Sequence, residues 1–340
     1  MNIDGIAKLA QACFRECPTI VLGCGASMHH NLPSMAILSD YLVTKMKTAG
    51  EPEELAWIQV RTALENGDHL ERALEGKHLP EDLLAKIVGL TWQCVNEKDM
   101  TLLNTAASDV GEFPLGRLLS GLFRSTQNEV HIVTTNYDRV AEYACNSEGI
   151  LFQTGFAPGY VQKWEGTRQV KFSRGGRASR VVKIWKVHGS LDWFQTKDER
   201  IVGLPLFKQP YSDYLPLIVT PGPYKFQKTY DDPFRTIING ADEALRSASA
   251  FLSVGFGFRD RHIPPKIVER CRENNVPIVV LAQTLTEEAK DFLKNKAGAK
   301  YMGIESAKEG SKVYLPRVPD GIEVAIAGLW SLPGFNKLVL

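Results

Sequence analysis

The sequence predicts an α/β protein in which a doubly wound parallel sheet carries a helical insertion. The first observation is a set of short, apolar runs of strand length, at residues 19–22, 130–133, 251–254 and 276–281. The second is that each run ends in small or polar residues. The third is that segments with helical spacing of apolar residues separate the runs. In a sheet of this Rossmann-like type, ligands bind at the carboxyl ends of the strands, so the residues after each run are the first candidates for a site.

The composition is that of an ordinary globular chain. Its 340 residues allow one large domain or two small ones, and 44% of them are apolar. The formal net charge of +1 gives no overall field that would favour nucleic acid or membrane. The start of the chain lacks a signal-peptide pattern, and no apolar run approaches the roughly 18 residues that span a bilayer. We therefore expect a cytoplasmic protein without membrane contact.

The cysteines and histidines predict no metal site. No two of the six cysteines have C-x-x-C spacing, so neither a zinc ribbon nor a thioredoxin-type motif is present. Cysteines scattered in this way indicate reduced thiols, which agrees with the cytoplasm. His29 and His30 are adjacent, and neighbours on a helix point about 100° apart, so they are poorly placed to share an ion.

The first strand, residues 19–22, runs into a glycine-rich turn. Glycines let a backbone approach a phosphate closely, and a following helix N-terminus would supply N–H donors. The full G-x-G-x-x-G fingerprint is absent, because Met28 and two histidines follow the turn. Pro33 then precedes an amphipathic helix. The turn consists of Gly23, Cys24, Gly25, Ala26 and Ser27.

Residues 50–127 read as helical throughout, with leucines and isoleucines at spacings of three and four. A doubly wound unit needs far fewer residues between its first two strands. We interpret the segment as a helical insertion or lid, and a few ordinary core helices remain the alternative.

Two strands end in side chains that suit catalysis. Residues 130–133 are followed by Thr134, Thr135, Asn136, Tyr137 and Asp138, which place an amide and a carboxylate at the edge of the sheet. An Asx turn that opens the next helix is the structural alternative. His188 likewise follows an apolar strand and precedes glycine. Its placement matches that of Asn136, which favours a functional role for both.

The segment 168–187 reads as a basic β-hairpin with its turn at Gly175 and Gly176. Such a ribbon could contact a polyanion or an acidic partner, but a solvated edge that resists aggregation is the favoured interpretation. We therefore expect no direct binding of nucleic acid. The basic residues are Arg168, Lys171, Arg174, Arg177, Arg180, Lys183 and Lys186.

A second glycine turn, formed by Gly255, Phe256 and Gly257, follows the strand 251–254. Residues 195–230 are rich in proline and read as irregular apart from a short strand near 217–219. Beyond residue 296 the pattern is weak, with a turn-rich stretch and then an apolar tail over 329–340.

In order, the four strand ends read Gly-Cys-Gly-Ala-Ser, Thr-Thr-Asn-Tyr-Asp, His-Gly-Ser and Gly-Phe-Gly-Phe. This combination resembles the Sir2 (sirtuin) superfamily, with its G-A-G-x-S, T-x-N-x-D, H-G and late glycine-turn signatures. Leu32-Pro33-Ser34 and Ser190-Leu191-Asp192-Trp193 are more similar to bacterial SIR2-like defence proteins than to the deacetylases. The resemblance implies a single SIR2-like domain over 1–340.

The chain departs from the deacylases of that superfamily in informative ways. Their zinc ribbon would lie between the histidine and the late glycine turn, where this chain has no cysteine. Ser34-Met35-Ala36 replaces their Phe-Arg pair, Cys24 replaces an alanine, and Gly257 replaces a serine. The resemblance therefore implies neither zinc nor an acetyl-lysine channel.

What the resemblance implies is consumption of NAD as a substrate. Asn136 would hold the ribose and order the attacking water, His188 would act as general base, and Asp138 would contact the nicotinamide-ribose side. The turn Gly23 to Ser27 would bind the pyrophosphate, with Pro33 and Thr135 in the same pocket. Gly255, Phe256 and Gly257 would bind the adenosine side.

The resemblance also implies a biological setting. The chain would be the NAD-depleting effector of an anti-phage system that works by abortive infection, a homo-oligomer regulated by a HerA-like hexameric ATPase. A catalytically quiet module that senses NAD or another nucleotide is the alternative from another class. A protein deacylase is disfavoured by the missing cysteines.

Overall fold

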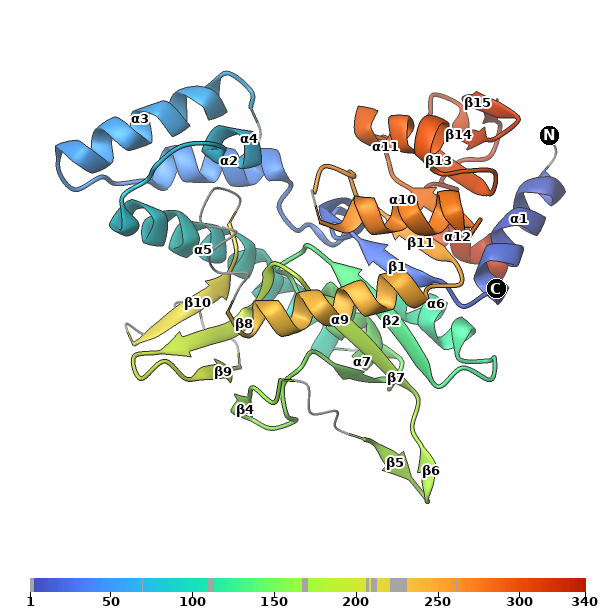
Figure 1. Ribbon diagram of the computed structural model, residues 1–340, viewed down its shortest axis with the longest axis horizontal. Helices are drawn as coiled ribbons and strands as arrows, with labels where there is room; N and C mark the ends of the chain where they lie inside the picture. The colour runs from blue at the N-terminus through green and yellow to red at the C-terminus, as the bar shows by residue number, and fades with distance from the viewer. Residues whose placement is uncertain are drawn as a thin grey trace.

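The computed structural model describes residues 3–68, 70–108, 113–166, 171–205, 208, 213–220, 231–260 and 262–340. Its centre is a nine-stranded sheet with helices packed on both faces (Figure 1), which confirms the predicted α/β fold. The strand order is β15-β14-β13-β12-β11-β1-β2-β7-β3, and the seven strands from β13 to β3 run parallel.

The sheet reverses its winding direction between β1 and β11. From β1 the chain builds one side of the sheet with β2, β7 and β3, and it later returns to build the other side from β11 outwards. Such a switch point opens a crevice at the carboxyl ends of the strands. The strands are β1 (Thr19–Leu22), β2 (Glu129–Thr134), β3 (Leu151–Gln153), β7 (Val181–Lys186), β11 (Phe251–Val254), β12 (Ile278–Leu281) and β13 (Tyr301–Ala307).

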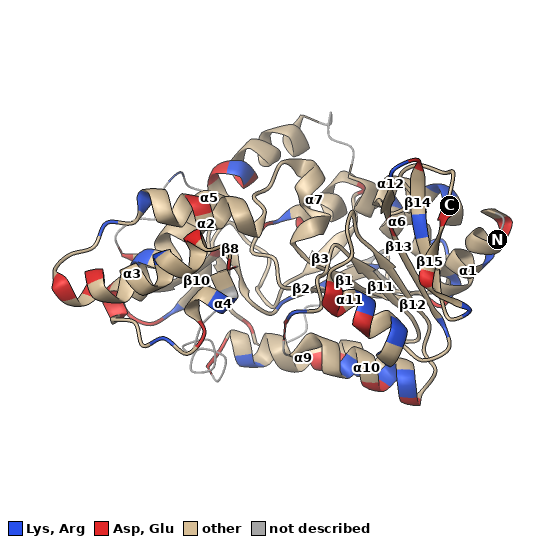
Figure 2. Ribbon diagram, turned by 90° about the horizontal axis from the view of Figure 1, so that it is seen from above, with Lys and Arg blue, Asp and Glu red and all other residues tan. Residues whose placement is uncertain are grey.

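Alternate strand residues enter two different cores. Ile20 and Leu22 of β1 pack with one set of helices, whereas Val21 between them packs with the other. Figure 2 shows α9 and α10 on the opposite side of the strands from α7. The first face carries α1 (Ile3–Arg15), α6 (Pro114–Leu122), α7 (Val140–Ser147) and α12 (Leu332–Val339). The second carries α9 (Phe234–Ser247), α10 (Ile263–Glu273), α11 (Glu287–Asp291) and the π-helical turn Phe292–Lys296.

A group of helices, which we call the lobe, stands beside the sheet with a core of its own. It consists of α2 (Met35–Lys45), α3 (Glu51–Glu65), α4 (Leu70–Leu74) and the first part of α5 (Glu81–Ala107). Its limits differ from the expected 50–127. Leu42 of α2 is buried in the lobe core, whereas Leu118 and Leu119 of α6 are buried against the sheet. The long helix α5 joins the two cores, because its Leu102 belongs to the sheet core.

The prediction of one continuous basic hairpin over 168–187 is wrong. A tight hairpin of β5 (Ser173–Arg174) and β6 (Arg177–Ala178) does turn at Gly175 and Gly176, with φ angles of 57° and 77°. The following strand β7, however, pairs in parallel with β2 and β3 inside the large sheet. Its Val182 and Ile184 are buried in the core, which is why this apolar run joins the sheet. Residues 167–170 lie outside the described residues.

The structure also has strands where the sequence pattern was weak. A small sheet with the order β10-β8-β9-β4 packs beside α5 and occupies part of the stretch expected to be irregular. After β13, an antiparallel pair and α12 replace the expected turns and tail. The elements are β4 (Gln162–Lys163), β8 (Gly189–Thr196), β9 (Ile201–Gly203), β10 (Tyr214–Ile218), β14 (Gly310–Leu315) and β15 (Val318–Val324). Within the described residues, the helices are all too short or too polar to cross a membrane.

Candidate active site

A cavity of about 710 Å³ lies at the carboxyl ends of β1, β2, β7 and β11, where the sheet reverses its winding. All the site residues expected from the sequence line it, although all of them except Pro33 come from four separate strand ends. Met35 and Leu38 of α2 and Val95 of α5 contribute to the wall, so the lobe forms one side of the cavity. The expected residues are Gly23, Cys24, Gly25, Ala26, Ser27, Pro33, Thr135, Asn136, Asp138, His188, Gly255, Phe256 and Gly257.

The two glycine turns pack directly on one another. The N–H of Gly25 donates to the carbonyl oxygen of Gly255 at 3.1 Å. A Cβ atom on Gly23 would lie 2.4 Å from that same oxygen, and one on Gly25 would lie 2.8 Å from the Cα of Gly255. Gly255 also has a φ of +59°, which favours glycine. The glycines are therefore needed for contact between the turns as well as for any approach by a ligand.

The expected phosphate cradle takes a different form from a loop that opens directly into a helix. Two short 3₁₀ turns, Cys24–Ala26 and Met28–His30, follow β1, and α2 begins only at Met35. The N–H groups of Gly23, Gly25, Ala26 and Ser27 all donate to carbonyl oxygens of the protein. Four of the five N–H groups of the turn are therefore already used by the protein.

Asn136 joins the loop after β2 to the first glycine turn. Its side-chain nitrogen donates to the carbonyl oxygen of Gly23 at 3.0 Å and to the hydroxyl of Ser27 at 3.1 Å. Its backbone N–H donates to the hydroxyl of Thr134 at 3.0 Å. With both amide hydrogens used by the protein, the side-chain oxygen is the group left to accept a hydrogen bond from a ligand or a water.

Asp138, and not Asn136, supplies the Asx turn considered from the sequence. Its carboxylate accepts from the N–H of Val140 at 3.1 Å, which opens α7. The Ser27 hydroxyl also bonds to this carboxylate and so links it to Asn136. Burial raises the pKa of Asp138 above its usual value, although the positive charge of Lys186 acts in the opposite direction. Asp138 is therefore a buried carboxyl at the cavity wall that also opens α7, and its contact with the nicotinamide-ribose side stays a prediction.

A set of buried charges lies behind the loop, and the sequence pattern did not reveal it. Lys186 is fully buried, and its ammonium donates to the main-chain oxygen of Asp138 and, at 3.0 Å, to Glu142. The Arg139 guanidinium pairs with Asp99 of α5. Buried charges are held only when paired. These two pairs fix the loop that carries Asn136 from behind.

His188 lies opposite Asp260, which is not among the site residues expected from the sequence. The imidazole Nε2 lies 3.2 Å from Oδ2 of Asp260, and both side chains are mostly buried. Oδ1 of Asp260 accepts from the N–H groups of His262 and Ile263, at 2.8 and 3.1 Å, where α10 begins. An acidic residue just before a predicted helix was the available signal. In the sequence, Asp260 looks like an ordinary helix cap. Its contact with His188 exists only because the fold brings the end of β7 beside it.

Among the residues that the structure describes, no group of three or more His, Cys, Asp or Glu side chains is arranged to hold a metal ion. The rings of His29 and His30 lie 3.8 Å apart between centroids and are tilted by 42°, whereas His30 stacks on Phe113 at 5.0 Å. Burial lowers the pKa of His30 to about 4, so this ring is neutral near pH 7.

A family model described as a SIR2-like domain matches residues 130–299, which is half of the chain. Among solved structures, the chain is similar to a Sir2 homologue in complex with NAD, with 14% identity over 89% of this chain and 88% of that one and a TM-score of 0.45. It is also similar to a structure concerned with sirtuin substrate affinity, with 11% identity over 88% and 93% and a TM-score of 0.44. No curated protein matches the sequence.

Proposed function

This chain belongs to the SIR2-like family within the Sir2 superfamily, and on that premise we propose that it hydrolyses NAD to nicotinamide and ADP-ribose. The observation that supports this most is the convergence of thirteen residues, expected from four separate motifs, on one cavity. Its volume of about 710 Å³ suits a ligand of dinucleotide class, and its position is the one where such ligands bind in doubly wound sheets.

The reaction breaks the bond between the ribose and the cationic pyridinium ring. Nicotinamide leaves as a neutral molecule, the ribose passes through an oxocarbenium-like state, and water adds at the same carbon. The side-chain oxygen of Asn136 is the acceptor that would order this water or a ribose hydroxyl. His188 would take the proton that the water gives up. The products are nicotinamide and ADP-ribose, and the proton passes from His188 to solvent.

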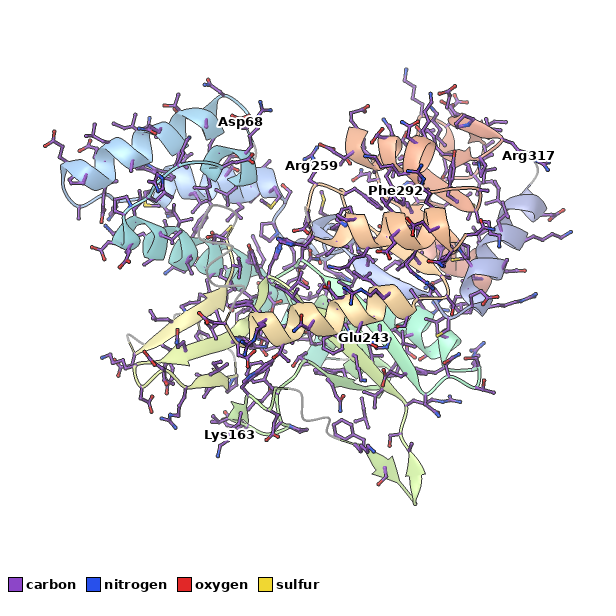
Figure 3. All side chains as sticks on the ribbon, in the orientation of Figure 1. Asp68, Lys163, Glu243, Arg259, Phe292 and Arg317 are labelled. Carbon is purple, nitrogen blue, oxygen red and sulfur yellow. The ribbon has the colours of Figure 1, made fainter. Side chains whose placement is uncertain are left out.

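Arg259 is the residue that would balance the negative charge of the pyrophosphate. Among the described residues that line the cavity, Arg259 is the one with a lysine or arginine side chain. Figure 3 shows it on the side of the molecule that faces the lobe. Its Nε lies 3.2 Å from Glu288 with both side chains about half exposed, so the guanidinium could turn to a ligand at little cost.

The test is to incubate the purified protein with NAD and measure free nicotinamide, for wild type and for His188→Ala. We expect turnover by wild type and its loss in the variant, with NAD binding reduced much less, because the base acts in the transition state. His78→Ala is the matched control, since His78 is exposed and lies outside the cavity lining. Near-normal turnover by His188→Ala would overturn the assigned base, and binding of NAD with no turnover at all would favour the sensing module.

For the biological role, we propose a NAD-depleting effector of anti-phage defence that forms a homo-oligomer and is regulated by a HerA-like hexameric ATPase. The lobe supports such regulation, because it forms one wall of the cavity and also exposes Ile37, Leu55 and Ile58. A partner seated on the lobe would change the shape of the cavity. Mass and NAD turnover should be measured for the chain alone and with the ATPase. A fully active monomer that does not respond to the ATPase would contradict this regulation and leave the NAD hydrolase proposal intact.

A further inference from the structure

We propose that Asp260 is a positioning residue for His188, holding the ring with a proton on Nε2 so that Nδ1 remains the proton acceptor. The motifs that identify the family do not include this aspartate. The inference deepens the proposed function, since it names the group that sets the protonation state of the proposed base.

The pairing depends on two segments that are far apart in the sequence. His188 follows β7 and Asp260 follows the late glycine turn after β11, and both line the cavity. The 3.2 Å separation between Nε2 and Oδ2 is hydrogen-bonding distance. A carboxylate oxygen only accepts, so a hydrogen bond across this separation would place the proton on Nε2. In the neutral ring, Nδ1 then carries the lone pair.

Asp260 is itself held rigidly. Its other oxygen, Oδ1, accepts from the N–H groups of His262 and Ile263 at the start of α10. The positive end of the helix stabilises the carboxylate charge at this point. The aspartate is 8% exposed, so water competes little for Oδ2. One oxygen is thus fixed by the helix and the other is directed at the histidine.

The arrangement has two consequences for a base. It selects Nδ1 as the nitrogen that accepts the proton, and it places a negative charge beside the imidazolium that forms when the proton arrives. The hydrogen-bond partners of metal-ligating histidines, which act in the same way through the second ring nitrogen, are worth about 10–100-fold in activity, and we expect an effect of about this size here.

The informative variant is Asp260→Asn. The asparagine oxygen can still cap α10, so the fold should persist, and its NH₂ group then faces Nε2. An NH₂ group donates, so the ring should move its proton to Nδ1, the nitrogen that was the acceptor. Asp242→Asn is the matched control, because Asp242 pairs with Lys266 at 2.5 Å with a side chain that is also mostly buried, on the neighbouring helices α9 and α10.

The decisive measurement is the ¹⁵N spectrum of histidine ring nitrogens at a pH where the ring is neutral, with the His188 signals assigned by their loss in His188→Gln. We expect the Nε2–H form in wild type and Asp242→Asn, and the Nδ1–H form in Asp260→Asn. The same tautomer in all three proteins would overturn the proposal. This readout needs no NAD, so it decides the role of Asp260 even if wild type proves to hydrolyse none.

Turnover gives the second readout where NAD is hydrolysed. We expect kcat to fall about 10–100-fold in Asp260→Asn with KM little changed. Thermal unfolding of both variants should show that the fold is retained. A folded Asp260→Asn protein with wild-type kcat would contradict the proposed role.

Discussion

The side-chain amide of Asn136 donates a hydrogen bond to the main-chain oxygen of Gly23, across 3.0 Å and between the ends of two adjacent strands. Position 23 has no room for a side chain, because the backbone of Gly255, at the end of the neighbouring strand, lies against Gly23. Three strand ends are therefore fixed relative to one another before any ligand arrives. Asn136 has a structural role and a proposed catalytic one at the same time.

We predict that Asn136→Ala lowers NAD turnover by more than about 100-fold, the cost of removing one preorganised polar group in a transition state. The free energy of unfolding should also fall by about 1–3 kcal/mol, because Gly23 and Ser27 lose the donor they share. Nicotinamide release and urea unfolding measure the two effects. Full turnover in the variant would remove Asn136 from the mechanism, whatever happens to its stability.

The candidate residues that directly follow strand ends could be predicted from the sequence alone. Short apolar runs followed by glycine, asparagine or histidine specify where a chain leaves a parallel sheet, and the sheet brings those exits together. Asp260 was missed because its capping role is local and its contact with His188 is not. Lys186 was counted as part of a basic surface ribbon, since charge alone does not distinguish a buried lysine from an exposed one.

The outer strands were harder to predict for a different physical reason. Strands β14 and β15 pair antiparallel at the edge of the sheet, and no residue of β15 is fully buried. Their side chains therefore show no continuous apolar run, and glycines at 310 and 321 suggest turns. The small sheet around β8 is likewise defined by its packing on Trp92 of α5. Neither feature can be read from local spacing.

Cys24 should report on occupancy of the cavity. Its thiol is exposed in the cavity wall, whereas Cys13, Cys94, Cys145 and Cys271 are buried. Burial raises the pKa of Cys13 and Cys271 to about 12 and of Cys94 to about 11, which leaves almost no thiolate at pH 7.5. A small maleimide should therefore label Cys24 well before these four, and NAD should slow the labelling.

The pH dependence of that labelling has a definite sign. Desolvation of the thiol by the surrounding protein raises the pKa of Cys24, and the negative charge of Asp138 raises it further. Because the thiolate is the reactive form, the labelling rate should rise about tenfold for each pH unit below that pKa. Mass spectrometry of the labelled protein locates the site, and Cys24→Ala is the control that should lose the label at this position. Labelling at an unchanged rate in saturating NAD would show that NAD does not occupy this cavity.

We predict that removal of divalent metal leaves NAD turnover unchanged. The proposed chemistry uses only the amide of Asn136 and the imidazole of His188, and no metal-holding cluster occurs among the residues with described positions. The measurement is turnover after dialysis against a chelator, together with the zinc content of the sample. Stoichiometric zinc that is lost in parallel with activity would contradict the prediction.

Asp99 provides the link between the lobe and the site that we expect to matter most for stability. It lies on α5, is fully buried, and accepts from the backbone N–H of Arg139 at 2.9 Å, from its guanidinium and from the Tyr143 hydroxyl at 2.7 Å. Asp99→Ala leaves the Arg139 charge buried without its partner. Breaking a buried pair in this way costs about 3–5 kcal/mol.

Urea unfolding should therefore show a much lower midpoint for Asp99→Ala, while Glu65→Ala should stay within about 0.5 kcal/mol of wild type, since its pair with Arg61 is exposed. Because α5 continues from Asp99 into the lobe, limited proteolysis should cut the lobe of Asp99→Ala faster than that of Glu65→Ala. Equal midpoints for the two variants would mean that Asp99 does not hold α5 to the loop. If the two variants had equal rates of proteolysis but unequal urea midpoints, Asp99 would stabilise only the sheet core. The lobe would then not depend on the contact between Asp99 and the loop.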